Sequence, residues 1–311
     1  MKNQSILRLI AIAIALLGVS LWMGQQAYSW FPPQAAKEAV LVDDLFSFLV
    51  TLGTFIFLGV TGTLLYSIAF HQAGKYDMRD GPPIEGNVTL EVVWTAIPIL
   101  LVFWIAIYSY NVYSQMGIRG PMEVMHVHNP MGMESANAEP MEEASEPIEK
   151  IEVLAKQWAW VFRYPKENVT STELHLPANQ RVSLTMRSQD VIHGFYIPAF
   201  RLKQDIIPNQ PIDFEFTPIR PGTYRLTDSQ YSGTYFATMA ANVVVEETED
   251  YQNWLKLAAN RTPTVAPNQA ASEYAQESKA KIKSGYPTVV PASAPLVNYS
   301  TGLAIAEDKE E

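Results

Sequence analysis

The segment Leu45–Phe70 runs for 26 residues without a charged side chain. A helix needs about 20 predominantly apolar residues to cross the hydrocarbon core of a bilayer. A second charge-free segment, Val92–Tyr110, has 19 residues and carries Pro98 in its first third. A proline there is tolerated where a neighbouring helix satisfies the carbonyl group that it frees. The sequence therefore predicts two membrane helices, joined as a hairpin over residues 42–113.

A third apolar run, Leu9–Met23, follows Lys2 and Arg8 near the N-terminus. Its 15 residues are short for a membrane span. The same layout of basic residues and an apolar core describes a secretory signal sequence. Residues 1–30 are therefore either a cleaved signal or an N-terminal membrane anchor, which would make a third helix.

Basic residues in short loops indicate which end of each helix faces the cytoplasm. Lys75 and Arg79 lie in the loop between the two predicted helices, and Lys2 and Arg8 precede the first apolar run. This distribution places that loop in the cytoplasm. The long C-terminal portion is then predicted to lie on the extracytoplasmic or lumenal side.

Residues 114–147 have the composition of a linker, rich in Met, Glu, Pro, Asn and Gly. They include six of the eleven methionines, together with His126 and His128. Thioether and imidazole groups are suitable copper ligands, so copper capture by this linker stays open as an alternative. Scattered Met and His in a polar loop more often bind nothing specific.

Short alternating segments separated by turn residues follow from residue 148 to residue 248. Such closely spaced strands are typical of an all-β sandwich of about 100 residues. Beyond it, residues 249–311 are expected to form one short helix (Tyr251–Ala259) and a disordered tail. The expected strands include Ile151–Leu154, Trp158–Tyr164, Leu174–Leu176, Val182–Met186 and Phe214–Phe216.

Composition excludes several classes of function. The formal net charge of −10 argues against nucleic acid as a partner, because phosphates require a basic surface. The chain has no cysteine, which excludes disulfides, thiolate nucleophiles and any thiolate metal site.

Four motifs resemble one family of membrane proteins, subunit II of the haem-copper respiratory oxidases (the cytochrome c oxidase subunit 2 family). Within this family, the chain most resembles the copper-less, quinol-oxidising type, such as the cyanobacterial alternative terminal oxidase. The resemblance implies a two-helix transmembrane hairpin followed by a cupredoxin-like β-sandwich, in a bacterial membrane such as the plasma or thylakoid membrane of a cyanobacterium. The motifs are Leu90–Pro98, Gln157–Trp160, His193–Pro198 and Pro221–Tyr224.

In that family the ligand loop of a dinuclear copper centre reads Cys-x3-Cys-x3-His-x2-Met, with a Glu two residues after the first Cys and a further His before the loop. Two thiolates must bridge the copper ions, and this chain has none, so the resemblance implies that no metal is bound here. The neutral amide at the Glu position is also a poorer ligand for the family's magnesium ion. The matching positions here are His193, Asp228, Gln230, Ser232, Phe236 and Met239.

The resemblance further implies a non-catalytic subunit of a terminal oxidase that reduces oxygen to water. The haem and copper would be in the partner subunit I, subunit III would be a second partner, and quinol would be the donor to the complex. Trp158 matches the position where the family accepts electrons, and without copper behind it a structural role is expected. Glu91 matches a carboxylate at the mouth of a proton pathway. On the residues alone, a helix-start acid favoured by the macrodipole is the simpler explanation, whereas the resemblance implies that Glu91 is a proton-entry residue.

Two alternatives remain. The chain could belong to a true cytochrome c oxidase that accepts electrons from cytochrome c. It could instead be a cupredoxin-like binding or assembly protein that works outside an oxidase.

Overall fold

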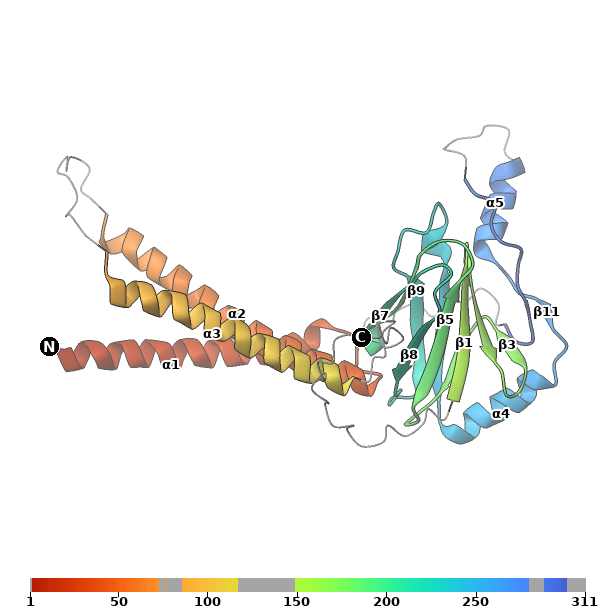
Figure 1. Cartoon of the computed structure of the whole chain (residues 1–311), viewed down its shortest axis with the longest axis horizontal. Coiled ribbons are helices and arrows are strands. Elements are labelled where there is room, and N and C mark those ends of the chain that lie inside the picture. The colour runs from red at the N-terminus through yellow and green to blue at the C-terminus, as the bar shows by residue number, and fades with distance from the viewer. Residues whose placement is uncertain (1, 73–75, 77–85, 117–148, 280–287, 301–311) are drawn as a thin grey trace, which may run out of the picture. The chain divides into compact units, whose positions relative to one another are not determined.

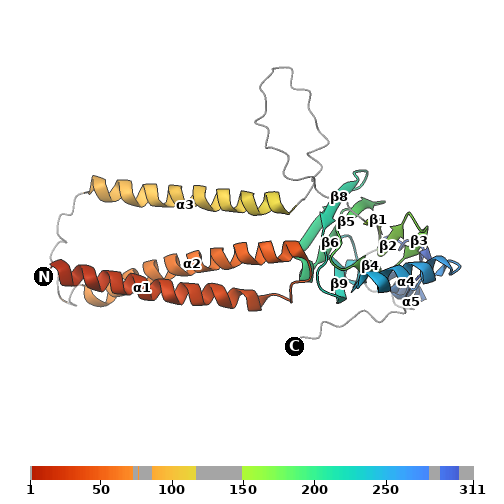
Figure 2. The same ribbon diagram turned by 90° about the horizontal axis from the view of Figure 1, so that it is seen from below.

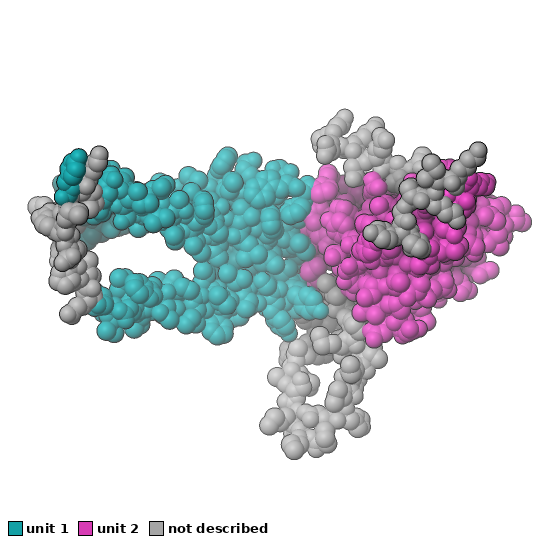
Figure 3. Space-filling model, turned by 90° about the horizontal axis from the view of Figure 1, so that it is seen from above, with its two compact units in different colours: residues 1–31, 41–115 teal, residues 32–40, 116–311 magenta. Residues whose placement is uncertain are grey.

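The computed structural model describes residues 2–72, 76, 86–116, 149–279 and 288–300. The chain forms two compact units, coloured separately in Figure 3. One comprises residues 1–31 and 41–115, and the other comprises residues 32–40 and 116–311. The linker histidines His126 and His128 lie outside the described residues.

The first unit consists of long apolar helices: α1 (Lys2–Ala27), most of α2 (Lys37–Phe70) and α3 (Val88–Gln115). A short 3-10 turn, η1 (Tyr28–Trp30), follows α1. Within the described chain, three helices are long and apolar enough to cross a membrane. Both segments of the expected hairpin lie inside α2 and α3, and Pro98 lies within α3.

The C-terminal end of α1 and the η1 turn touch the N-terminal part of α2 through small and polar groups; both helices are labelled in Figure 2. The Ser47 hydroxyl donates to the Gly24 carbonyl at 2.9 Å. The Tyr28 hydroxyl donates to the Asp44 carboxylate at 2.7 Å. A Cβ atom at Gly24 would collide with the Thr51 hydroxyl, so glycine is what permits this close approach.

The second unit is a sandwich of two five-stranded sheets, with strand orders β3-β2-β1-β5-β8 and β4-β10-β9-β6-β7 (Figure 1). The first sheet contains β1 (Glu149–Lys156), β2 (Ala159–Tyr164), β3 (Val169–Ser171), β5 (Val182–Ser188) and β8 (Ile212–Phe216). The second contains β4 (Leu174–Pro177), β6 (His193–Ile197), β7 (Leu202–Ile206), β9 (Gly222–Asp228) and β10 (Ala240–Glu246). This confirms the expected all-β sandwich.

Alternation along the strands builds the core. In β1 the side chains of Ile151, Val153 and Ala155 are buried, whereas those between them are more exposed. Val153 lies opposite Phe162 of β2 and beside Met186 of β5, and both of these side chains are fully buried. Burial of each such side chain contributes about 1.5–3 kcal/mol, so the period-two pattern determines which face of each sheet points inward.

The C-terminal region differs from the disordered tail expected beyond residue 259. It contains the expected helix as α4 (Thr248–Ala259), and then β11 (Thr264–Val265), α5 (Gln269–Lys279) and β12 (Leu296–Val297). Asn298 accepts hydrogen bonds from the Thr170 amide and hydroxyl at 3.0 and 2.9 Å. The Ala292 amide donates to the Gln157 carbonyl at 2.6 Å. These long-range bonds, which a polar composition does not reveal, hold the segment on the sandwich.

Candidate functional site

The ligand-loop positions meet where two neighbouring strands come together. His193 begins β6 and Asp228 ends β9, and these strands pair with Phe195 opposite Asp228. The pairing brings together side chains that are 35 residues apart in sequence. His193 is fully buried and Asp228 is 6% exposed, so any charge that they carry must be satisfied inside the protein.

The Asp228 carboxylate accepts four hydrogen bonds. One oxygen lies 2.7 Å from the His193 Nδ1 atom and also accepts from the Ser232 hydroxyl at 2.7 Å. The other oxygen accepts from the backbone amides of Gly194 at 2.7 Å and Gln230 at 3.0 Å. Burial opposes ionisation of Asp228, but these donors outweigh it and lower the carboxyl pKa below its usual value.

The second ring nitrogen of His193 also faces a carboxylate, since its Nε2 atom lies 2.9 Å from an oxygen of Asp190. Burial disfavours the charged ring, but hydrogen bonds to Asp228 and Asp190 outweigh it and raise the His193 pKa. With a carboxylate at each nitrogen, the arrangement favours the imidazolium, which donates from both. A neutral ring would turn one lone pair toward a carboxylate oxygen.

Sequence reasoning missed Asp190, although its position three residues before His193 was a usable signal. One Asp190 oxygen accepts from the Val191 amide at 2.7 Å, and the other accepts from the Gln157 amide at 2.6 Å. These bonds orient the carboxylate toward the histidine.

The other ligand-loop positions surround this network without joining it through their side chains. The Gln230 side-chain amide donates to Asp205 at 2.8 Å. Phe236 is partly buried, and its ring packs edge-on against Tyr231 with 5.3 Å between ring centroids. The Met239 side chain is buried in the core, and its carbonyl accepts from the Asp228 amide at 3.0 Å.

These residues do not fit a thiolate-bridged copper pair. The positions of the bridging thiolates hold a carboxylate and a hydroxyl that bond to each other, Asp228 and Ser232. A histidine that donates from both nitrogens offers no lone pair to a metal. Serine and histidine also both bind the same aspartate, so the three residues do not form the relay of a hydrolase triad, in which histidine contacts the serine.

Trp158 is 3% exposed and belongs to the core of the sandwich. Its ring nitrogen donates to the Ser232 carbonyl at 3.2 Å, and its ring packs edge-on against Tyr235 at 5.2 Å between centroids. The Tyr235 hydroxyl donates to Glu277 of α5 at 2.7 Å, and this bond raises the tyrosine pKa to about 12. The C-terminal helix is thereby bonded to the residue that packs on Trp158.

Glu91 lies in the first turn of α3. Its amide donates to the Asn87 carbonyl at 2.9 Å, and the Leu90 amide donates to the Asn87 side chain at 3.1 Å. Asn87 therefore caps the helix, and the Glu91 carboxylate is not needed for that purpose.

Three apolar helices and a sandwich with an oxidase-like ligand loop define a membrane-anchored subunit with a cupredoxin-like domain. Two family models match the chain: cytochrome c oxidase subunit II, transmembrane domain, over residues 20–112, and the periplasmic domain of the same subunit over residues 166–248. The chain belongs to this family. It is therefore an integral membrane protein of an oxidase complex, with its C-terminal domain on the extracytoplasmic side.

Similar proteins carry two kinds of name. Cytochrome c oxidase subunit 2 of Synechocystis is 34% identical over 303 residues, covering 86% of this chain and 91% of that protein. Cytochrome c oxidase subunit 2 of Thermostichus vulcanus is 34% identical, and the match covers 80% of this chain and 84% of that protein. Quinol oxidase subunit 2 of Bacillus subtilis is 25% identical, and the match covers 74% of this chain and 65% of that protein.

One solved structure among those similar to this chain is the periplasmic domain of subunit II of cytochrome oxidase from Bradyrhizobium japonicum. It is 24% identical, has a TM-score of 0.35, and covers 37% of this chain and 95% of that chain.

Proposed function

We propose that this chain is subunit II of a terminal oxidase that reduces oxygen to water with electrons from a quinol, and that it carries no dinuclear copper. The observation that carries the proposal is the placement of His193 between Asp190 and Asp228. Hydrogen bonds inside the protein occupy the groups that would otherwise face copper. The domain then accepts no electrons, and the donor delivers them to another subunit.

In this proposal the chain anchors and covers subunit I, which holds the haem and copper where oxygen is reduced, and subunit III is a further neighbour. Trp158 acts as core packing beneath Tyr235. Residues 1–30 stay in the mature protein and include a third membrane helix, because α1 contacts α2 through Gly24 and the following turn η1 contacts it through Tyr28. The presence of quinol oxidase subunits among the relatives supports a quinol as donor.

Cytochrome c is the competing donor, favoured by the names of the relatives that are 34% identical. The test is to purify the assembled complex and compare oxygen consumption with a quinol and with reduced cytochrome c. We expect turnover with the quinol alone, no copper assigned to this subunit by metal analysis, and no near-infrared copper band. Turnover with cytochrome c together with that band would refute the proposal.

Glu91 is proposed as a proton-uptake group at the start of α3. Glu91→Gln removes the ionisable group and is expected to slow turnover of the assembled oxidase by about tenfold or more, because a positioned proton carrier typically contributes at least that much. Glu91→Asp should retain most activity. The matched control is Asn87→Ala, which removes the helix cap and leaves the carboxylate in place. Equal turnover for Glu91→Gln and the wild type would show that Glu91 is an ordinary helix-start acid.

A further inference from the structure

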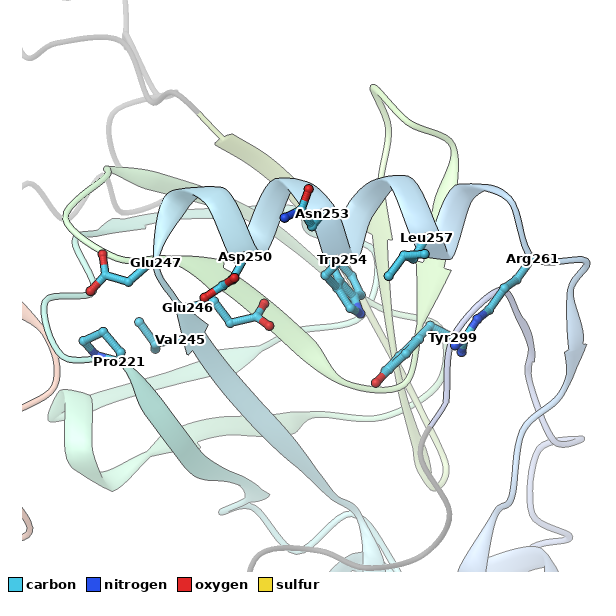
Figure 4. A pocket seen from close by; sticks show the side chains of 10 residues that line it. All are labelled: Pro221, Val245, Glu246, Glu247, Asp250, Asn253, Trp254, Leu257, Arg261 and Tyr299. Atoms are coloured by element: carbon cyan, nitrogen blue, oxygen red, sulfur yellow. The ribbon is translucent and has the colours of Figure 1, made fainter.

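A groove with a volume of about 520 Å³ lies along α4, between this helix, the end of β10 and Tyr299 (Figure 4). It belongs entirely to the second unit and lies outside the His193 network. Its size is in the range of cavities that hold small ligands or a few residues of a peptide. The residues that matter for its chemistry are Glu246, Glu247, Asp250, Trp254, Arg261 and Tyr299.

One end of the groove is acidic. Glu246 is already bound to His175, whose Nδ1 atom lies 2.9 Å from the glutamate oxygen. The carboxylates of Glu247 and Asp250 are exposed, and neither makes a side-chain hydrogen bond or ion pair within the part of the chain that the structure describes. Two negative charges are therefore available to a cationic ligand.

The groove also contains a buried donor without an acceptor. Trp254 is 7% exposed, and its ring nitrogen has no hydrogen-bond partner among the described residues. One face of the indole stacks on His175, with 3.8 Å between ring centroids and 8° between the planes. Figure 4 shows the Trp254 nitrogen on the side of the ring turned away from α4. A buried N–H group without an acceptor is unfavourable, and a ligand oxygen would remove this penalty.

The helix dipole explains part of this arrangement without a ligand. Acidic side chains near the N-terminus of α4 stabilise the helix, and this accounts for Glu249 and Asp250. It does not account for the hollow or for the unsatisfied Trp254 nitrogen. Leu257 lines the groove beyond Trp254 and is 65% exposed, which provides an apolar surface for a hydrophobic group of a ligand (Figure 4).

We propose that this groove binds a lysine- or arginine-bearing peptide segment of another protein. The cationic head would lie against Glu247 and Asp250, a backbone carbonyl of the segment would accept from Trp254, and an apolar side chain further along the segment would pack on Leu257. A polyamine meets the charge requirement but offers no oxygen acceptor to the indole. A second copy of this chain is a poor partner, since its formal charge is −10 and like charges repel.

The test uses the full-length chain in detergent and a fluorescent, acetylated and amidated tetrapeptide that contains two arginines. We expect saturable binding that weakens as salt is added, because exposed charges are screened. Glu247→Gln combined with Asp250→Asn should weaken binding by about tenfold, an amount typical of losing a complementary charge pair. The matched control is Glu249→Gln, which removes an acid from the same helical turn that does not line the groove.

Spermidine serves as the comparison ligand and should compete weakly for the wild-type chain. Trp254→Phe keeps an aromatic ring and removes the donor, so it should reduce the preference for the peptide over spermidine. Circular dichroism establishes whether that variant folds, and if it does not, the comparison of the acidic variants with Glu249→Gln decides alone. An equal loss in Glu249→Gln, equal binding of spermidine, or no binding of the peptide would each overturn the proposal.

Discussion

Asp228→Ala is expected to destabilise the sandwich by about 3 kcal/mol or more, because it removes one partner of a buried charged pair. The substitution leaves His193 with a single carboxylate and removes the acceptor of the Ser232 hydroxyl and of two backbone amides. Asp228→Asn retains a hydrogen-bond acceptor without the charge, so it should lower the free energy of unfolding by less than Asp228→Ala does. The measurement is urea unfolding of the full-length chain in detergent, followed by tryptophan fluorescence, since Trp158, Trp160 and Trp254 all lie in the buried core of the second unit.

The matched control is Asp213→Asn. Asp213 is exposed on β8, and among the described residues its carboxylate accepts only from the Thr185 hydroxyl, at 2.8 Å. The free energy of unfolding should therefore change by no more than about 0.5 kcal/mol. A loss for Asp228→Ala no larger than that of the control would contradict the description of a buried charged network.

The same pair should make stability depend on pH. The His193 pKa is raised above its usual 6.5, so this group stabilises the fold fully below about pH 6.5, and the contribution is lost as pH rises through the folded pKa. The Asp228 pKa is lowered below its usual 3.8, so its contribution is present above that value and is lost as pH falls through the folded pKa. The pair therefore contributes most to the stability of the fold between about pH 4 and 6.5. Asp228→Asn should make the stability fall less steeply as the pH rises above about 6.5.

A variant with Asp228→Cys, Ser232→Cys and Phe236→His is expected to bind a dinuclear copper centre, whereas the wild type is expected to bind none. The three changes supply both thiolates and the second imidazole at the spacing of the family's loop. They also remove the Asp228 carboxylate that holds a proton on the His193 Nδ1 atom, and so free that nitrogen for a metal. Purified chain reconstituted with copper would be analysed for bound metal and for the near-infrared band.

The control keeps Phe236→His and places the two thiols out of register, with Ser229→Cys and Tyr231→Cys. Both variants contain two thiols, so copper bound equally by the two would reflect adventitious thiolate binding. Copper with the near-infrared band only in the first variant is the expected result, and no excess over the control would mean that the loop has lost the geometry of the family as well as its ligands.

Much of the site could be predicted from sequence because the ligand loop is a local pattern. The resemblance to the family's ligand loop identifies His193, Asp228 and Ser232, and the strand pairing brings these three together. Asp190 was missed because its role depends on the turn before β6, which directs its carboxylate at the histidine. The bond from Tyr235 to Glu277 was missed for a different reason, since it joins residues 42 positions apart in a region whose composition suggested disorder.

The sequence by itself determined the class of this protein. A charge-free run of 26 residues must find an apolar environment, and an alternating pattern of period two must bury one face of a sheet, whatever the remainder of the chain does. The missing cysteines likewise rule out thiolate ligands at any position. Only the tertiary structure decided what replaced them, namely a histidine between two carboxylates. Hydrogen-bond partners and protonation depend on distances of a few ångströms between distant residues, and the packing of the two sheets sets those distances.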